Sequence, residues 1–327
     1  MPFLLIVIIA IAMVFDFLNG FHDSSNIVAT MISSRALSPR IALGITAVAE
    51  FSGPFLFGVA VATTIGSEVV DPAAITSVVI IAALSSAILW NLFTWYFGWP
   101  SSTSHALIGG LIGAVGVAEG LSTIKLAGLE KVLIALFVSP VLGLVFGFLV
   151  LRLIYFLARG ASPGINSLFK RGQVVTALAL ALSHGTNDAQ KTMGIIAMAM
   201  VTTGFTTQFH VPWWVILLSA SAIALGTAIG GWRLIKTLGG KFYKIRPVHA
   251  FGSQLASASI ILGAALLGGP VSTTQVVSSA VMGAGAADRL SKVRWTVGRD
   301  IAVAWVLTIP VSALVAAGLY LLIHLFV

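Results

Sequence analysis

Two stretches of this sequence place ionisable and amide side chains at regular spacing inside apolar surroundings. The first consists of Asp16, Asn19, Gly20 and Asp23. The second consists of His184, Asn187, Asp188 and Lys191. In both, the members are spaced i, i+3, i+4 and i+7, which aligns them on one face of a helix. An ionisable group inside a membrane costs at least ~2.5–3.5 kcal/mol on insertion scales, so both faces must point into a helix bundle or a wet cavity.

Two interpretations of these polar faces are open. They could form a structural network that locks two helices together. We favour a site for a small cation, such as Na⁺, held by the carboxylates of Asp23 and Asp188. Backbone carbonyls would join them where Gly20 and Gly185 locally loosen each helix. Further residues that could serve cation coupling are Asn26, Asn187 and Glu50. Glu50, in the second apolar run, could instead be paired for structural reasons.

The coupled ion could be Na⁺ or H⁺. Na⁺ needs several oxygen ligands, and we favour it because both Asp motifs are intact. A proton needs only one group that titrates near neutrality, and His22 beside Asp23 is such a group. A neutral His22 that donates one hydrogen bond is the alternative.

Two Ser/Thr-rich segments, each introduced by a proline, indicate different chemistry. Proline suits the first turn of a helix and Ser or Thr suits its cap, so each segment predicts a helix that starts within the membrane. Free backbone N–H groups, the positive end of the helix dipole and a row of hydroxyls then form an anion site without a permanent charge. Either segment alone could be a plain cap, but the pair favours anion binding. The candidate residues are Ser101, Ser102, Thr103, Ser104, Ser272, Thr273 and Thr274.

Anion donors and buried carboxylates in one chain would repel the anion through a low-dielectric interior unless a cation binds between them. The expected cargo is therefore an oxyanion that is carried together with Na⁺ or H⁺. A carboxylate can accept a hydrogen bond from a protonated phosphate oxygen, which sulfate lacks at neutral pH. Phosphate is mildly favoured for this reason.

The composition indicates which elements carry these groups. Of 327 residues, 58% are hydrophobic and 9% are charged, and the mean hydropathy is +1.05. Soluble domains carry roughly a quarter charged residues, so a soluble enzyme is excluded and an all-α polytopic membrane protein is predicted. Each crossing needs about 20 apolar residues. Ten candidate segments begin near Phe3, Ile41, Ala74, Ser101, Val132, Gly172, Pro212, Ala250, Val271 and Ile301. The two that follow a proline turn are short enough to be re-entrant half-helices.

Loop charges orient these segments. Lys and Arg gather after the first, fifth, seventh and ninth segments, as they do in cytoplasmic loops. This predicts a multi-pass protein of the cell (inner or plasma) membrane, surrounded by lipid, with both termini outside. The net charge of +8 comes from these loops, so nucleic acid is not an expected partner. There is no cysteine, which excludes disulfides and a thiol nucleophile.

The chain also repeats itself. Residues 20–26 align with residues 185–191 at an offset of 165, and residues 100–105 align with residues 270–275 at an offset of 170. Each half contains five candidate segments, and an odd number inverts the second copy in the membrane. Inverted repeats with Gly/Pro-interrupted segments at matching positions are typical of secondary transporters that work by alternating access.

We therefore predict a first repeat over residues 1–158, a cytoplasmic linker over residues 159–171 and an inverted second repeat over residues 172–327. The turn at residues 99–100 would lie on the cytoplasmic side and the turn at residues 269–270 on the outer side.

The four blocks at residues 20–26, 100–105, 185–188 and 270–275 resemble the signature of the inorganic phosphate transporter (PiT) family. That signature has a Gly-Ala-Asn-Asp-like block and a Pro-Val-Ser-Thr-Thr-His-like block in each half. The resemblance covers nearly the whole chain and implies symport of inorganic phosphate with Na⁺ or H⁺. It also implies cation binding at Asp23 and Asp188, a role for Glu50 in phosphate transport, and phosphate binding by the Ser/Thr segments.

Three residues depart from the family pattern. His22 replaces an asparagine, Gln275 replaces a histidine, and Gln254 stands where a glutamate is expected. The loss of an acid and the gain of a titratable group leave the coupled ion and its stoichiometry open. Candidates for proton transfer or charge compensation are His22, Lys191 and Gln254.

Alternatives remain for substrate and mechanism. A branch of the same family carries sulfate, so sulfate or another oxyanion is an alternative cargo. A phosphate channel is the alternative mechanism, because paired half-helices also build pores. An enzyme is not expected, because Ser104 and His105 are adjacent and point about 100° apart on a helix, which prevents a catalytic relay. No cofactor is expected beyond the co-transported ion, and a homo-oligomer is compatible with the sequence.

Overall fold

The computed structural model describes residues 1–68 and 75–326, and this part of the chain consists of helices and the turns between them. The helices of the first half are α1 (Phe3–Ser33), α2 (Pro39–Phe57), α3 (Ala60–Thr63), α4 (Ser77–Phe97), α5 (Thr103–Ala118) and α6 (Leu126–Leu157). Those of the second half are α7 (Ile165–Thr202), α8 (Trp213–Ile229), α9 (Trp232–Gly240), α10 (Pro247–Leu266), α11 (Thr273–Asp288) and α12 (Trp295–His324). Short helical turns are η1 (Thr64–Glu68), η3 (Leu121–Thr123) and η4 (Leu290–Lys292). The all-α prediction is confirmed.

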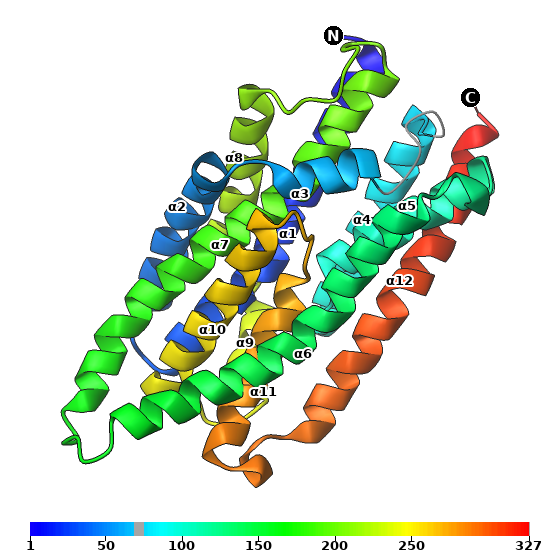
Figure 1. Cartoon of the computed structure of the whole chain (residues 1–327). Coiled ribbons are helices and arrows are strands. Elements are labelled where there is room, and N and C mark those ends of the chain that lie inside the picture. Colours follow the sequence, from blue (N-terminus) through cyan, green and yellow to red (C-terminus); the bar gives the residue numbers. More distant parts are fainter. Residues whose placement is uncertain (69–74, 327) are drawn as a thin grey trace.

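The helices form an elongated bundle in which the two halves of the chain are interleaved (Figure 1). Helix α1 packs on α8, and α2 packs on α7. Likewise α5 packs on α12, and α6 packs on α11. Each half therefore completes its packing on the other half. Both chain ends lie at one end of the bundle, and the loop between α6 and α7 lies at the opposite end (Figure 1).

Three loops that were predicted to share the cytoplasmic side meet at one end of the bundle. Arg35 follows α1, Lys244 and Arg246 connect α9 to α10, and Arg294 precedes α12, and all four residues line one pocket. The loop between α6 and α7 is shorter than the predicted linker over residues 159–171. Helix α6 ends at residue 157 and α7 begins at residue 165, so the last basic residues of the predicted linker belong to the first turns of α7.

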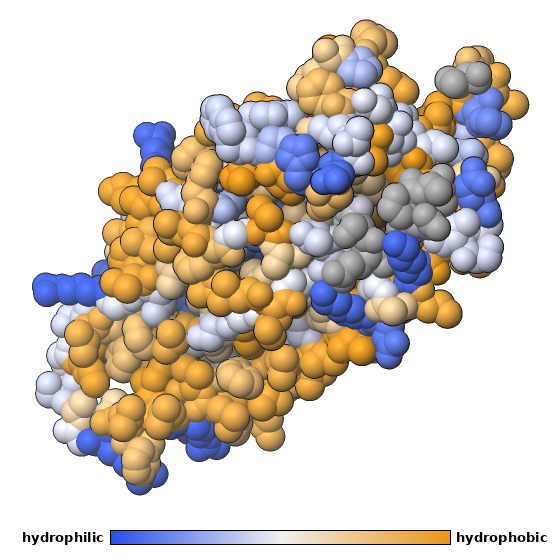
Figure 2. Space-filling model, turned by 45° about the horizontal axis from the view of Figure 1, so that its top comes forward, coloured by the Kyte–Doolittle hydropathy of each residue, from blue (hydrophilic) through white to orange (hydrophobic). Residues whose placement is uncertain are grey.

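The exterior of the bundle is suited to lipid. Large apolar side chains are exposed along the helices, among them Leu153, Val306 and Leu314. Apolar side chains cover most of the face seen in Figure 2, while hydrophilic side chains gather in small groups. This exterior, together with the long apolar helices, makes the chain a multi-pass membrane protein.

The ten predicted segments coincide with ten helices, but not all are full spans. In the described residues, α1, α2, α4, α6, α10 and α12 are long and apolar enough to cross a membrane, and α8 with α9 would add a seventh span that bends by 68°. The predicted start of the third segment near Ala74 lies outside the described residues, and α4 begins at Ser77. Helices α5 and α11 have 16 residues each, about 24 Å, which is short of a bilayer core of about 30 Å. Ten full crossings are therefore too many, and the half-helix alternative fits α5 and α11.

The turns that precede these two half-helices follow one design. Gly98 and Gly268 adopt φ of +68° and +70°, a left-handed conformation that glycine reaches without steric cost. The hydroxyl of Ser102 then accepts the N–H of His105 at the start of α5, and the hydroxyl of Ser272 accepts the N–H of Gln275 at the start of α11. The two predicted helix starts are confirmed, with serine caps at both.

The first turns of α5 and α11 lie side by side within the bundle. The placement of the preceding turns, at residues 99–100 and 269–270, on opposite sides of the membrane stays a prediction. The side-chain nitrogens of His105 and Gln275 are 3.2 Å apart, and the Ser104 hydroxyl lies 3.3 Å from the Val271 carbonyl oxygen. All four residues are buried. Helix α4 packs on α5, and α10 packs on α11, so each pair forms a hairpin, and the two hairpins meet at the first turns of α5 and α11.

Candidate functional site

The carboxylate of Asp23 on α1 joins the two Ser/Thr segments. Thr274 donates its hydroxyl to Oδ1 at 2.8 Å, and Thr273 donates to Oδ2 at 3.3 Å. Thr103, from the other half-helix, lies 3.4 Å from the same Oδ2. The predicted cation group and the predicted anion groups therefore form one site.

The second acidic motif has a different partner. Asp188 on α7 forms an ion pair with Lys191, one helical turn further along. The Lys191 ammonium also donates to the Ser104 hydroxyl at 2.5 Å and to the Val271 carbonyl at 2.9 Å. With only 1% of its surface exposed, Lys191 is one of the largest fully buried side chains of the described chain. This half of the site thus contains a built-in positive charge.

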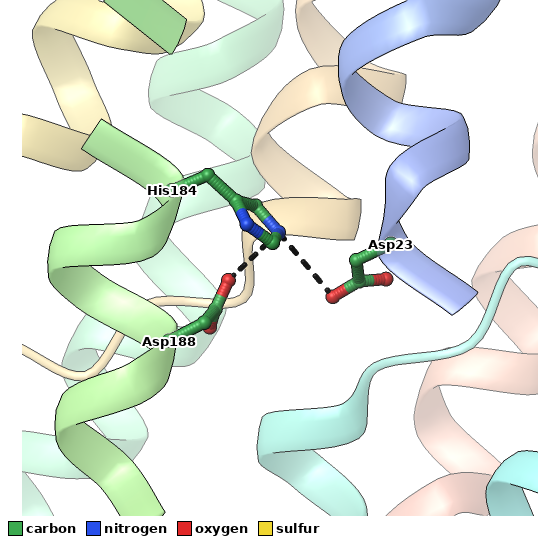
Figure 3. A group of neighbouring side chains, drawn as sticks. All are labelled: Asp23, His184 and Asp188. Atoms are coloured by element: carbon green, nitrogen blue, oxygen red, sulfur yellow. Dashed lines mark ion pairs between the residues drawn. The ribbon is translucent and has the colours of Figure 1, made fainter. Parts of the chain in front are cut away.

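His184 lies between the acids of three helices. Its Nε2 is 2.9 Å from Oδ2 of Asp188 and 3.6 Å from Oδ2 of Asp23, as Figure 3 shows. Its Nδ1 contacts Oε1 of Glu50 on α2. The ligand atoms of Asp23, His184 and Asp188 lie within 4.8 Å of one another, a spacing that could hold a metal ion. His184 belongs to the second polar face but was not among the predicted site residues, and its position one turn before Asp188 was the signal that could have identified it.

The glycines do not act as predicted. Helices α1 and α7 continue without a break through Gly20 and Gly185, so no carbonyl ligands are freed by a local loosening of the helix. The Gly20 carbonyl instead accepts the Thr227 hydroxyl at 3.1 Å. A Cβ on Gly185 would lie under 3.0 Å from the backbone of Glu50, and one on Gly20 would meet α8 in the same way. These glycines allow close helix packing, which at Gly185 brings the Glu50 carboxylate to His184.

Two buried amides border the site. Asn26 donates to the Thr274 hydroxyl at 3.0 Å, and Asn187 donates to the Gly269 carbonyl at 3.1 Å. The Oδ1 atoms of both amides have no hydrogen-bond partner among the residues that the structure describes. These oxygens are available as ligands for a cation.

The remaining predicted residues divide between the site and its surroundings. His22 lies 3.1 Å from Oδ1 of Asp23 and 3.4 Å from the Thr94 hydroxyl. Ser101 donates to that Thr94 hydroxyl, whereas Ser102 and Ser272 serve as caps. The structure does not bring Gln254 to the acids.

Gln254 instead links three helices. Its amide donates to Thr30 on α1 at 2.9 Å and accepts the Thr176 hydroxyl from α7 at 2.7 Å. A further buried acid, Asp16, accepts the Thr192 hydroxyl at 2.5 Å and was not among the predicted site residues, although it begins the first polar face.

Acidic groups outnumber fixed positive charges in the site. Asp23, Glu50 and Asp188 supply three carboxyl groups, and Lys191 supplies one ammonium. Every one of these side chains is buried from both ends of the bundle. An oxyanion at the Ser/Thr segments would therefore be repelled unless further positive charge arrived with it.

Known proteins with similar sequences are phosphate transporters. The sequence model of the Phosphate transporter family matches residues 19–163 and 158–316. The chain is 44% identical over 326 residues to a Bacillus subtilis (strain 168) protein named "Probable low-affinity inorganic phosphate transporter", with 98% of both chains covered. It is 45% identical over 319 residues to a protein of the same name from Rhizobium meliloti (strain 1021), covering 97% of this chain and 96% of the relative.

The fold is also found in a solved structure. The protein named "The sodium-dependent phosphate transporter" superposes with a TM-score of 0.89 at 25% identity, covering 99% of this chain and 100% of that one. These relatives are transporters rather than enzymes, and the similarity spans both acidic motifs and both Ser/Thr segments. The chain belongs to the phosphate transporter family.

Proposed function

We propose that this protein is a cation-coupled symporter of inorganic phosphate that works by alternating access. The cation binds at Asp23, and phosphate binds at the first turns of α5 and α11. The observation that carries this proposal is the set of threonine hydroxyls, from both half-helices, that point at the Asp23 carboxylate.

These hydroxyls suggest how the two ligands are coupled. A hydroxyl has one proton to donate, so a threonine that donates to Asp23 cannot donate to phosphate at the same time. A cation bound at the carboxylate takes over its oxygens and releases the hydroxyls. They are then free to turn toward an oxyanion. Cation binding would thus prepare the phosphate site.

Electrostatic repulsion also makes phosphate binding depend on the cation. Two unit charges about 4 Å apart interact by about 4 kcal/mol at an effective dielectric constant of 20. A cation that neutralises one of the three buried carboxylates therefore removes a repulsion of this order. Without it, phosphate would face a site in which carboxyl groups outnumber the one fixed positive charge of Lys191.

For the coupled ion we favour Na⁺. Asp23, Thr274 and the free Oδ1 of Asn26 offer the oxygen ligands that a hard cation takes. The similar solved structure is named as sodium-dependent. Proton coupling through His22, which contacts Asp23 directly, is the competing possibility that the experiment below distinguishes.

We further propose that the halves are inverted copies that exchange partners. The packing of α2 on α7 corresponds to that of α8 on α1, and the packing of α5 on α12 corresponds to that of α11 on α6. A rocking motion of one group of helices against the other would open the buried site to one side of the membrane at a time.

With the basic end of the bundle in the cytoplasm, both termini lie outside. A reporter fused after residue 327 should then be outside, and tags at Arg159 and Lys241 should be cytoplasmic; tags on opposite faces would contradict the proposal.

The decisive experiment is uptake into proteoliposomes at fixed pH, with labelled phosphate or sulfate as cargo and with Na⁺ present or replaced by choline. We expect phosphate uptake that requires a Na⁺ gradient and that survives dissipation of the proton gradient. Full uptake without Na⁺, which collapses when the proton gradient is dissipated and in His22→Asn, would assign the coupling to H⁺. Phosphate flux without any cation gradient would identify a channel, and a preference for sulfate would overturn the substrate.

A further inference from the structure

We propose that Lys191 is a tethered cation that permanently fills one of two equivalent cation positions. The transporter would then carry one cation fewer per phosphate than its two acidic motifs allow. This inference rests on the proposed function and concerns its stoichiometry.

The surroundings of the Lys191 ammonium are those of a cation site. Three oxygens accept from Nζ: a carboxylate oxygen of Asp188, the Ser104 hydroxyl and the Val271 carbonyl. An ammonium has three N–H donors, so these contacts use all of them. Carboxylate, hydroxyl and carbonyl oxygens are also the ligands that a hard metal cation prefers. Nζ therefore stands where a mobile ion would otherwise be held.

The other half of the chain has the same position without the lysine. At the repeat offsets of 165 and 170, Lys191 corresponds to Asn26 and Ser104 corresponds to Thr274. The contacts correspond as well, because Asn26 donates to the Thr274 hydroxyl as Lys191 donates to the Ser104 hydroxyl. The asparagine side chain is shorter and neutral. Asp23 therefore has hydroxyl donors and the imidazoles of His22 and His184 as neighbours, but no lysine that would supply a permanent positive charge.

The two positions should therefore behave differently during transport. The Asp188–Lys191 pair stays neutral in every state, because its cation is covalently attached and cannot leave with the cargo. The Asp23 position can gain and lose an ion. Lys191 also reaches a residue of the phosphate segment, Ser104, so it attracts the anion without adding to the charge that crosses the membrane.

The test exchanges the residues between the two positions. Lys191→Asn makes the second position resemble the first, and we expect one additional Na⁺ per phosphate in paired ²²Na⁺ and phosphate flux measurements, with a steeper dependence of uptake on Na⁺ concentration. Asn26→Lys places a tethered cation at the first position, and we expect the ratio to fall by one. Lys292→Asn is the matched control, since Lys292 also pairs with an aspartate one turn away but lies at the basic end of the bundle, and its ratio should equal that of the wild type.

If Lys191→Asn or Asn26→Lys still transports phosphate but moves the same number of Na⁺ ions per phosphate as the wild type, the inference is overturned. If a variant folds but does not transport, Na⁺ binding to the purified protein replaces the flux ratio. Lys191→Asn should then bind one Na⁺ more than the wild type, and equal binding would also overturn it. A failure of the proposed function looks different, because the wild type itself would then move phosphate without any cation. If the coupled ion proves to be H⁺, the same ratios are measured for protons.

Discussion

Two lysine–aspartate pairs in this chain join residues that are close in sequence, three and four positions apart, but have very different surroundings. Asp188 and Lys191 are at most 2% exposed, and the lysine makes two further contacts within the site. Asp288 and Lys292, at the end of α11 and in η4, are about a quarter exposed, at 24% and 25%, and Arg246 shares the same carboxylate. The comparison teaches that closeness in sequence is enough to create such a pair, while burial and additional contacts distinguish the pair in the proposed binding site from the pair at the surface.

The largest effect is expected from breaking the buried half of this comparison. Asp188→Asn should abolish coupled uptake and lower the melting temperature, because an uncompensated buried ammonium costs about 3–5 kcal/mol. Asp23→Asn should also abolish uptake, yet leave folded protein in the membrane, since one fewer buried charge eases insertion. Uptake is measured per amount of membrane protein, with Asp288→Asn as the control that retains it. Wild-type rates in either buried variant would refute the cation-site assignment.

Next in size is the loss of hydroxyls at the first turns of α5 and α11, beside the Asp23 carboxylate. The double replacement of Ser272 and Thr273 by alanine should weaken phosphate binding at least tenfold, because a hydrogen bond to a charged group contributes about 1.5–3 kcal/mol. The corresponding replacement of Ser102 and Thr103 should do the same. Calorimetry with inorganic phosphate measures the affinity, and Ser259→Ala, on the exposed side of α10, is the control. Unchanged affinity would leave these segments as plain helix caps.

A moderate effect is expected where the backbone brings Glu50 to His184. Gly185→Ala should destabilise the protein by about 1–3 kcal/mol through overpacking, because the added methyl group meets the α2 backbone. Gly44→Ala, on α2 itself, meets no atom within 4 Å and should be neutral or slightly stabilising. Thermal unfolding in detergent compares the two. Equal melting temperatures would contradict the close approach of α2 and α7.

The smallest effect concerns the exposed pair and depends on pH. Burial alone would raise the pKa of Asp288, but the hydrogen bond and charge of Lys292, together with the charge of Arg246, lower this pKa below its ordinary value. A lowered pKa contributes stability above the pKa of the unfolded carboxyl and loses it as pH falls through the folded pKa. Exposed pairs contribute about 0–1 kcal/mol, so Asp288→Asn should lower the melting temperature only slightly at pH 7. The difference should vanish in acid, and a constant difference at all pH values would contradict this cause.

The features that could be predicted from the sequence are local. The serine caps at residues 102 and 272 follow from proline and hydroxyl spacing, and the polar faces of α1 and α7 follow from helical periodicity. The bridging position of His184 could not be predicted, because it depends on how closely α2 approaches α7. For the same reason Gly185 was misinterpreted, since a glycine that loosens its own helix and one that admits a neighbour look alike in sequence. Charged residues near 170 indicated a loop, although they lie in the first turns of α7.

The interleaving of the halves has a consequence for biosynthesis. Membrane chains are made from the N-terminus onward, yet the helix that packs most extensively on α5 is α12, the last helix to be made. The glycines at 109 and 113 of α5 receive the α12 backbone directly, and Trp305 of α12 donates to the Pro100 carbonyl in the turn before α5. Helix α5 is therefore made before α12 exists, and the face of α5 that packs on α12 stays uncovered until translation ends. The proposed phosphate site is therefore complete only once the final helix has been inserted.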